Sequence, residues 1–315
     1  MSILITIILG IALLLMLAAM RTRSMAKNAE KIVPQPGELC SVDGGVLHYV
    51  DTGPQDGGVV VLIHGIAGQL QHYTYAMVDL LKDDYRVIAV DRPGCGYSSV
   101  SQGDGASLND QSRMIDALLG VLGVNRAVVV GHSLGGAVAL RLALDCPDRV
   151  AGLALLCPLT QAQPEAPDAL KGLQVSTSWL RHLLGATIAV PMAKWTSDKV
   201  LTAVFHPESY PPDFMDRAGA ALGLRPKAFI TACSDMSAVH LEMPAQVARY
   251  ADDLKVPGGI LYGAEDAILS PDLHGQNMVA HGLTLETLPG RGHMIPITAS
   301  QDCVDFVRRV AANTL

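Results

Sequence analysis

Apolar runs and the polar turns between them divide the chain into alternating strands and helices. Short runs rich in β-branched residues predict strands at 59–63, 85–90, 127–130 and 150–156. Between these runs, amphipathic or small-residue stretches predict helices at 71–81 and 108–122, and a helix that ends near residue 146. Strands that alternate with helices are typical of a mostly parallel sheet with helices on both faces. We therefore predict an α/β fold.

The pattern on either side of this region extends the same sheet. Two alternating segments, 38–42 and 46–51, flank Asp43-Gly44-Gly45, which predicts a β-hairpin. Near the other end of the chain, strands are expected at 258–262 and 283–288, followed by a helix over 299–311. The core is thus predicted in two parts, residues 38–157 and 241–315.

The alternation stops between the two parts of the core. Residues 158–240 contain no comparable strand, are rich in proline, and include helix-like pieces at 179–184 and 215–222. We interpret this segment as a helical cap inserted between strands of the sheet. Ligand sites of open α/β sheets lie beyond the carboxyl ends of the strands, where such a cap would overhang. The alternative is a second small domain with no role in the chemistry.

The amino-terminal segment is apolar on every side. Ser2–Met20 contains no charge, and its nineteen residues would span about 28 Å as a helix, close to the thickness of a bilayer core. A cleaved signal peptide would have a basic start and a shorter apolar run. A buried core helix would rarely be apolar on every face at the extreme terminus of the chain. We predict a transmembrane anchor at 1–23, followed by a polar linker at 24–37.

The charges after this segment predict how the protein is oriented. Arg21, Arg23, Lys27 and Lys31 follow the apolar run directly, against one acid, Glu30. The positive-inside rule then places the remainder of the chain in the cytoplasm.

Composition narrows the range of partners. The formal net charge is −7, the isoelectric point is about 5.8, and no basic stretch is interleaved with aromatic residues, so nucleic acid is not an expected partner. The six cysteines form no C-x-x-C pair and no zinc-type spacing, which indicates reduced thiols. No motif suggests a metal or an organic cofactor, and nothing indicates the oligomeric state.

One sequence motif organises the chemistry. The strand at 127–130 leads into Gly131-His132-Ser133-Leu134-Gly135, and a helical stretch follows at once. This is the G-x-S-x-G pattern of a nucleophile elbow, in which a strained serine projects above the sheet edge. The helix behind the serine directs its free N–H groups toward the reaction centre.

Two further groups follow strands, in the order that a catalytic triad of this kind requires. A serine hydroxyl needs a base, and the imidazolium that forms needs a carboxylate. We expect Ser133 to be the nucleophile, His293 the base and then the acid, and Asp266 the orienting carboxylate. Glu265, adjacent to Asp266, is the alternative acid. Of the other histidines near these motifs, His132 is expected to point elsewhere as a packing residue, and His64 to support its loop by hydrogen bonding.

The tetrahedral intermediate of acyl transfer requires donors for its oxyanion. Two backbone N–H groups are expected to point at it. One belongs to Leu134, directly after the nucleophile. The other belongs to Ile66, in the loop after the strand at 59–63.

Taken together, the motifs resemble those of the α/β-hydrolase superfamily. The resemblance covers about residues 40–313 and rests on H-G-I-A-G, D-R-P-G-C-G-Y-S, G-H-S-L-G-G, G-A-E-D and G-H-M, which begin at His64, Asp91, Gly131, Gly263 and Gly292. It implies the same roles for Ser133, Asp266, His293, Ile66 and Leu134, and a cap over 158–240. Dehalogenases and epoxide hydrolases of this fold use aspartate at the nucleophile position, so Ser133 argues against both.

The resemblance leaves several serine-dependent activities open. They include carboxylesterases, monoacylglycerol-type lipases, carbon–carbon bond hydrolases, iminopeptidases or other amidases, acyltransferases and perhydrolases. The anchor and the apolar cap favour lipophilic small-molecule esters at a membrane surface. A non-catalytic, membrane-tethered binding protein is the alternative from another class, and an intact triad argues against it.

Overall fold

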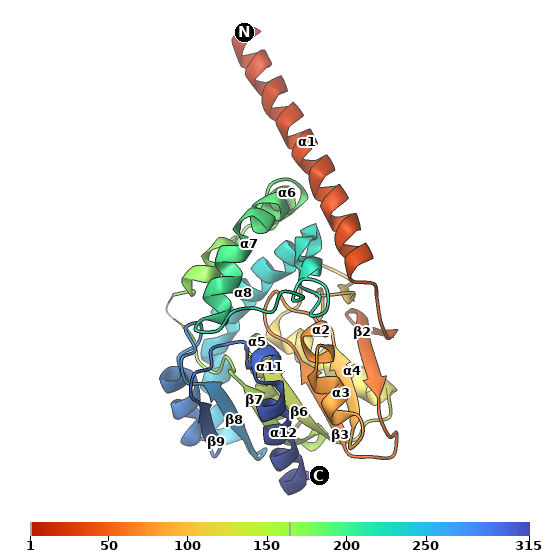
Figure 1. Ribbon diagram of the computed structural model, residues 1–315, viewed down its shortest axis with the longest axis vertical. Helices are drawn as coiled ribbons and strands as arrows, with labels where there is room; N and C mark the ends of the chain where they lie inside the picture. The colour runs from red at the N-terminus through yellow and green to blue at the C-terminus, as the bar shows by residue number, and fades with distance from the viewer. Residues whose placement is uncertain (1, 164) are drawn as a thin grey trace.

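The computed structural model describes residues 2–163 and 165–315, and one twisted sheet forms its centre (Figure 1). Within the described residues the sheet has nine strands, in the order β1-β2-β4-β3-β6-β7-β8-β9, with β5 paired to β2. The pairs β3·β4, β3·β6, β6·β7, β7·β8 and β8·β9 are parallel, whereas β1·β2, β2·β4 and β2·β5 are antiparallel. The predicted α/β fold is therefore confirmed. The strands are β1 Glu38–Val42, β2 Gly45–Thr52, β3 Val59–Ile63, β4 Arg86–Val90, β5 Ser99–Val100, β6 Ala127–His132, β7 Val150–Leu156, β8 Gly258–Gly263 and β9 Thr284–Leu288.

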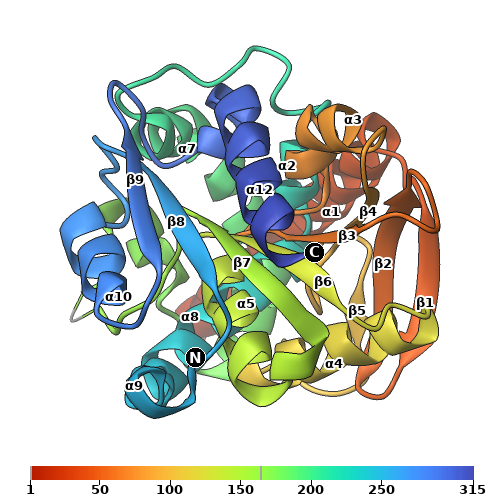
Figure 2. The same cartoon turned by 90° about the horizontal axis from the view of Figure 1, so that it is seen from below.

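Helices cover both faces of the sheet, as Figure 2 shows. On one face lie α3 (Met77–Leu81) and the carboxyl-terminal α12 (Ser300–Thr314), which contact each other. On the other lie α4 (Leu108–Val121) and α5 (Leu134–Asp145), also in contact. Because both faces are covered, the central strands are apolar except for His132 at the end of β6, and every residue of β6 and β7 is buried. The shorter helices of the core are α2 Gln71–Thr74, α9 Tyr250–Asp253, α10 Asn277–Val279 and α11 Ile295–Thr298.

The helix expected over 71–81 is two short helices, α2 and α3. Tertiary hydrogen bonds hold the first of them: the Tyr73 hydroxyl donates to the Ile63 carbonyl at 2.9 Å, and the Leu70 amide donates to Asp91 at 2.7 Å. The chain leaves the helical conformation at Ala76 (φ −154°), and α3 then packs beside β4 and α12. These contacts override the local helical pattern.

The segment between β7 and β8 is helical, as the sequence indicates. It contains α6 (Ser178–Ala186), α7 (Ala189–Phe205) and α8 (Pro226–Val247), together with 3₁₀ turns at Asp168–Leu173 and Ala220–Leu224. Another 3₁₀ turn, Pro147–Arg149, precedes β7. The helix expected over 215–222 is wrong. Gly219 there has φ +73°, and a Cβ on it would lie 2.9 Å from the Gln71 side chain, so the chain turns instead. The helix α8 also extends past residue 240 to Val247.

The amino-terminal helix α1 spans Ser2–Ile32, and its first part extends away from the rest of the molecule (Figure 1). It is long and apolar enough to cross a membrane, with a mean hydropathy of 3.0 in a window that is 0% buried. Its last part is not the linker expected at 24–37, because it remains helical to Ile32. Ala29 and Val33 pack against Ala221 and Leu222 of the cap, which stabilises the helix there.

Candidate active site

Ser133 lies in the sharp turn between β6 and α5. Its backbone has φ +54° and ψ −122°, a conformation that residues other than glycine rarely adopt. The flanking glycines make the turn possible. A Cβ on Gly131 would lie 2.4 Å from the Gly135 carbonyl oxygen, and one on Gly135 would lie 2.1 Å from the Ile63 carbonyl oxygen. The strain predicted for the serine is therefore present, and the packing around it leaves no room for side chains at either glycine.

The structure brings Asp266 and His293 together. Asp266 follows β8 and His293 follows β9, and His293 Nδ1 lies 2.7 Å from Asp266 Oδ2. The second carboxylate oxygen, Oδ1, accepts the amides of Ile268 and Leu269 at 2.8 and 2.9 Å. Both side chains are buried. With Nδ1 donating to the carboxylate, a neutral His293 has its lone pair on Nε2, which is the tautomer that a general base needs.

Glu265 has a different environment from its neighbour. It is exposed, whereas Asp266 is buried against the histidine. Of the two acids left open by the sequence, Asp266 is the one in contact with His293.

His132 connects the serine turn to the His293 loop. Its Nε2 lies 3.0 Å from the His293 carbonyl oxygen, to which it donates, and the two rings are 4.9 Å apart. The expectation that His132 points elsewhere is wrong, because the loop after β9 folds back over the end of β6.

The structure records no hydrogen bond from the Ser133 hydroxyl to His293 within the described residues. Such bonds are often long when no substrate is bound.

The two amides expected to bind the oxyanion lie on either side of the serine turn. Leu134 is the first residue of α5, so its N–H has no acceptor within the helix. Ile66 follows Gly65, which lies against Ser133: a Cβ on Gly65 would be 2.9 Å from the Ser133 Cβ. The loop is itself strained, with φ +50° at Ala67.

Three donors fix the orientation of the peptide between Gly65 and Ile66. The Gly65 carbonyl accepts from Arg92 Nη2 at 3.0 Å, from His64 Nδ1 at 2.8 Å and from the Gly68 amide at 3.3 Å. In a planar trans peptide the N–H points opposite to the carbonyl. The Ile66 N–H is therefore directed away from the Arg92 guanidinium.

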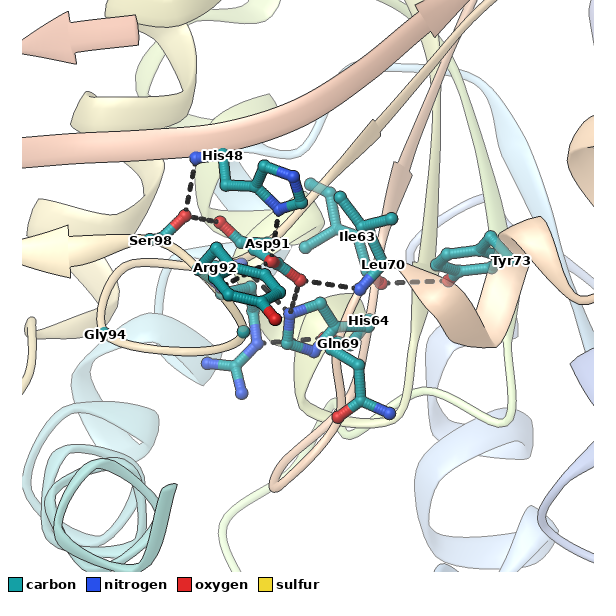
Figure 3. Close-up of polar contacts among 12 residues, drawn as sticks. His48, Ile63, His64, Gln69, Leu70, Tyr73, Asp91, Arg92, Gly94 and Ser98 are labelled. Atoms are coloured by element: carbon teal, nitrogen blue, oxygen red, sulfur yellow. Dashed lines mark hydrogen bonds and ion pairs between the residues drawn. The ribbon is translucent and has the colours of Figure 1, made fainter. Parts of the chain in front are cut away.

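Arg92 and Asp91 form hydrogen bonds to residues on either side of this loop, and Figure 3 shows both beside His64 and Leu70. Arg92 is completely buried and forms an ion pair with Asp235 of the cap helix α8 at 2.8 Å. It also donates to the His64 carbonyl at 2.9 Å and to Gln111 at 2.8 Å. Removing one partner of a buried ion pair leaves an uncompensated buried charge, which is strongly destabilising. The pair therefore holds the cap helix against the loop.

Asp91 forms the second half of this network. Its carboxylate lies 2.6 Å from His48 Nδ1 and accepts the amides of Leu70 and Tyr97 at 2.7 and 2.8 Å. Burial opposes ionisation, but these hydrogen bonds and the nearby histidines lower the pKa of Asp91. Sequence reasoning gave neither Asp91 nor Arg92 a role, although D-R-P-G is one of the motifs that carry the resemblance.

His64 supports the loop, as expected. Its Nε2 accepts the Arg92 amide at 3.0 Å, so Nδ1 carries the proton that is donated to the Gly65 carbonyl. Burial, reinforced by the Arg92 charge, lowers the pKa of His64 to about 3. Burial likewise lowers the pKa of His72 and of His274 to about 4.

These buried histidines predict a loss of stability in mild acid. Their pKa values are lower in the folded chain than the value of about 6.5 expected on unfolding. Below pH 6.5 the unfolded chain binds more protons, so the free energy of unfolding falls as the pH drops from about 6.5 toward 4. At pH 5 each such histidine contributes a loss of order 2 kcal/mol. We expect the urea midpoint to be lower at pH 5 than at pH 7.

A matched variant isolates the contribution of one histidine. His72 Nδ1 has no hydrogen-bond partner in the described part of the chain, so leucine at this position removes no bond made by that atom. His72→Leu should show a smaller difference between the two midpoints than the parent protein. Equal differences in the two proteins would contradict this origin of the acid sensitivity.

Cys157 lies beside the Asp266–His293 pair. Its sulfur and the ligand atoms of the pair all lie within 4.8 Å of one another. The thiol is buried, and burial together with the Asp266 charge raises its pKa well above the usual range, so it remains protonated. A cation at this cluster would have to displace the hydrogen bonds that both oxygens of Asp266 accept. That no metal is needed stays a prediction.

Comparisons with known proteins identify the fold family. Residues 58–298 match a family model described as the alpha/beta hydrolase fold. The protein named "Putative carbamate hydrolase RutD" of Variovorax paradoxus is 29% identical over 274 residues, which cover 84% of this chain and 97% of that protein. A 2-hydroxy-6-oxo-6-phenylhexa-2,4-dienoate hydrolase of Comamonas testosteroni is 34% identical over 116 residues, 36% of this chain and 40% of that enzyme. Among solved structures, an esterase from Thermogutta terrifontis superposes with a TM-score of 0.71 at 21% identity, covering 88% of this chain and 99% of that one.

Proposed function

Because the chain belongs to the α/β-hydrolase fold family and is a hydrolase, we propose that it cleaves carboxylic esters by a Ser133-His293-Asp266 triad. The observation that carries this proposal is the buried hydrogen bond between His293 Nδ1 and Asp266 Oδ2, beside a serine in a strained turn. The substrate is a lipophilic ester, as a carboxylesterase or a monoacylglycerol lipase would cleave.

The proposed reaction has two halves. His293 Nε2 takes the Ser133 proton as the hydroxyl oxygen attacks the ester carbonyl, and the imidazolium that forms is stabilised by Asp266. Collapse of the tetrahedral intermediate expels the alcohol, which receives that proton, and leaves an acyl-serine. Water, deprotonated by His293, then attacks the acyl-serine, and release of the acid regenerates the free hydroxyl.

The oxyanion of each tetrahedral intermediate is proposed to accept the N–H groups of Ile66 and Leu134. Arg92 contributes by fixing the Gly65 carbonyl and so the direction of the Ile66 N–H. These donors are oriented before the substrate binds, which is the form of electrostatic stabilisation that costs no reorganisation during reaction.

The proposal of a lipophilic substrate rests on the amino-terminal helix. We propose that α1 is a single-pass membrane anchor, since no described residue of its apolar part is buried and it is long enough to span a bilayer. The basic residues after it favour a cytoplasmic catalytic domain. An enzyme held at the bilayer surface meets esters that partition into lipid.

The test is hydrolysis of p-nitrophenyl esters of increasing acyl length by the full chain in detergent micelles. The full chain is needed because Thr22 donates a hydrogen bond to the cap at Thr187, which a truncation at residue 23 would remove. Turnover that rises with acyl length supports an apolar acyl pocket. Turnover confined to acetate would contradict the lipophilic substrate, and the absence of any ester cleavage would contradict the esterase proposal.

Carbon–carbon bond hydrolysis is the second candidate. The Comamonas testosteroni relative, whose name gives it a dienoate substrate, supports it over about a third of the chain. The same triad would activate the attacking group in either reaction. Loss of a dienoate chromophore in the presence of the protein, without any ester cleavage, would favour this alternative.

Replacing each of the two adjacent acids with its amide tests which of them orients the histidine. Asp266→Asn should lower kcat by about 10⁴-fold, because an amide cannot stabilise the imidazolium and can hold the ring in the wrong tautomer. Glu265→Gln should change kcat little, because Glu265 is exposed. Steady-state kinetics of both variants with one ester give the comparison. A larger loss in Glu265→Gln would move the acid by one residue.

A further inference from the structure

The cap carries an exposed apolar surface next to α1. We call the cap face the set formed by Trp179, Leu183, Ile188, Met192 and Trp195. Their exposed fractions are 66, 43, 45, 50 and 80%. The chain contains two tryptophans, and both are in this set. Large apolar side chains so exposed and so close together in one region usually mark a binding surface.

The spacing of the cap face shows that it forms stripes along two helices. Trp179 and Leu183 are four residues apart on α6, whereas Ile188, Met192 and Trp195 follow at intervals of four and three along α7. Inward-facing positions such as Gly185 and Val190 are buried. Each helix therefore exposes large apolar side chains on the side that faces away from its buried positions.

A hydrogen bond places the cap face at the depth where α1 becomes apolar. The Thr22 hydroxyl donates to the carbonyl of Thr187, which lies between α6 and α7, at 2.6 Å. Thr22 is two residues, or about 3 Å of helix, beyond the end of the apolar segment at Met20. In Figure 1, α1 runs past α6 and then leaves the domain on that side. A bilayer around the apolar segment would meet the junction of α6 and α7.

Basic groups lie between α1 and the cap. A cavity of about 430 Å³ separates α1 from the cap, and its lining includes Arg21, Ser24 and Asn28 of α1 and Lys194 of α7. Lys194 precedes Trp195, and both side chains are exposed. In a chain with a formal net charge of −7, two cations and two hydrogen-bonding side chains around one cavity suit a phosphate group.

We propose that the cap face lies in the headgroup layer of the anionic bilayer that α1 enters, with Arg21 and Lys194 on lipid phosphates. Tryptophan is the side chain most typical of this layer, where its ring is apolar and its N–H finds a polar partner. Juxtamembrane cations are attracted to the negative surface of such a membrane. The inference rests on the proposed anchor, and it is independent of which bond the enzyme hydrolyses.

Fluorescence of the two tryptophans tests the proposal. The full chain carrying Ser133→Ala, so that turnover plays no part, is placed in nanodiscs of phosphatidylcholine and phosphatidylglycerol, with acyl chains brominated near the headgroup or not brominated. Trp179→Phe and Trp195→Phe each leave one reporter. We expect the brominated lipid to quench each reporter by half or more. Quenching of less than a tenth in either variant, in protein that co-purifies with the nanodiscs, would overturn the proposal.

A charge reversal tests the phosphate contact. Lys194→Glu in the Trp179→Phe background should lower the quenching of Trp195 at least twofold in the anionic nanodiscs, and less in pure phosphatidylcholine. The matched control is Lys255→Glu, because Lys255 is an exposed lysine that precedes β8 at the opposite end of the strand from the cap. It should leave the quenching of Trp195 unchanged in both kinds of nanodisc. An equal effect of Lys194→Glu and Lys255→Glu, or none from Lys194→Glu, would overturn the role of Lys194. Failure of the protein to associate with the nanodiscs would overturn the anchor and the cap-face proposal together, whatever the esterase assays give.

Discussion

Replacing Ser133 with alanine is expected to lower ester turnover by about 10⁴-fold or more, without unfolding the protein. The substitution removes the hydroxyl oxygen that is proposed to form the acyl bond, and leaves the oxyanion donors and the cap in place. Alanine keeps the Cβ and the strained backbone of the turn (φ +54°), so the packing around it is unchanged. Initial rates with a p-nitrophenyl ester, at equal protein concentrations, measure the loss.

The control for Ser133→Ala is its stability and its covalent chemistry. We expect its urea midpoint to match that of the parent, since Ser133 makes no side-chain cap bond to α5. Only the parent should gain the mass of one phosphonyl group from a fluorophosphonate. Turnover by Ser133→Ala near the rate of the parent, with an unchanged fold, would mean that another group attacks the substrate.

Much of the fold could be predicted from the sequence, because each central strand can be recognised from a short local run of apolar residues. Parallel central strands are buried on both faces, so β3 and β7 are continuous apolar runs bounded by turns, and their observed limits match the predicted ones. The Ser107 side chain accepts the Asp110 amide and caps α4. These features depend on neighbouring residues alone.

The errors lie where distant segments decide the local structure. The break between α2 and α3 depends on bonds to Ile63 and Asp91, which the helical pattern of 71–81 cannot reveal. The helical continuation of α1 to Ile32 depends on Ala29 packing into the cap. Both are tertiary effects that override a weak local preference.

The candidate site divides in the same way. Ser133, Asp266 and His293 could be chosen from the sequence because each ends or follows a strand, and the carboxyl ends of parallel strands meet at one edge. Arg92 and Asp235 could not be paired, because they are 143 positions apart and only the folded cap brings them together. The contact of His132 with His293 was likewise hidden, since it depends on how one loop folds over another.

Replacing His293 with alanine is expected to lower turnover about as much as Ser133→Ala, because the base and the nucleophile act as one unit. His132 provides the matched control, since its ring lies 4.9 Å from that of His293 and it too is buried. His132 donates to the His293 backbone and so positions the base. Its replacement by alanine should cost at most about 10²-fold, the effect of a small misplacement.

Rescue by added imidazole separates the two roles. The space left by the His293 ring can admit imidazole next to Asp266, where it can accept the Ser133 proton, so the rate of His293→Ala should rise with imidazole concentration. The rate of His132→Ala should not, because its base is still covalently present. Equal losses in the two variants, with rescue of His132→Ala alone, would show that the base is His132 and not His293. A response confined to His293→Ala would support proton transfer through His293, because a residue that only maintained the shape of the loop would not be replaced by a diffusible base.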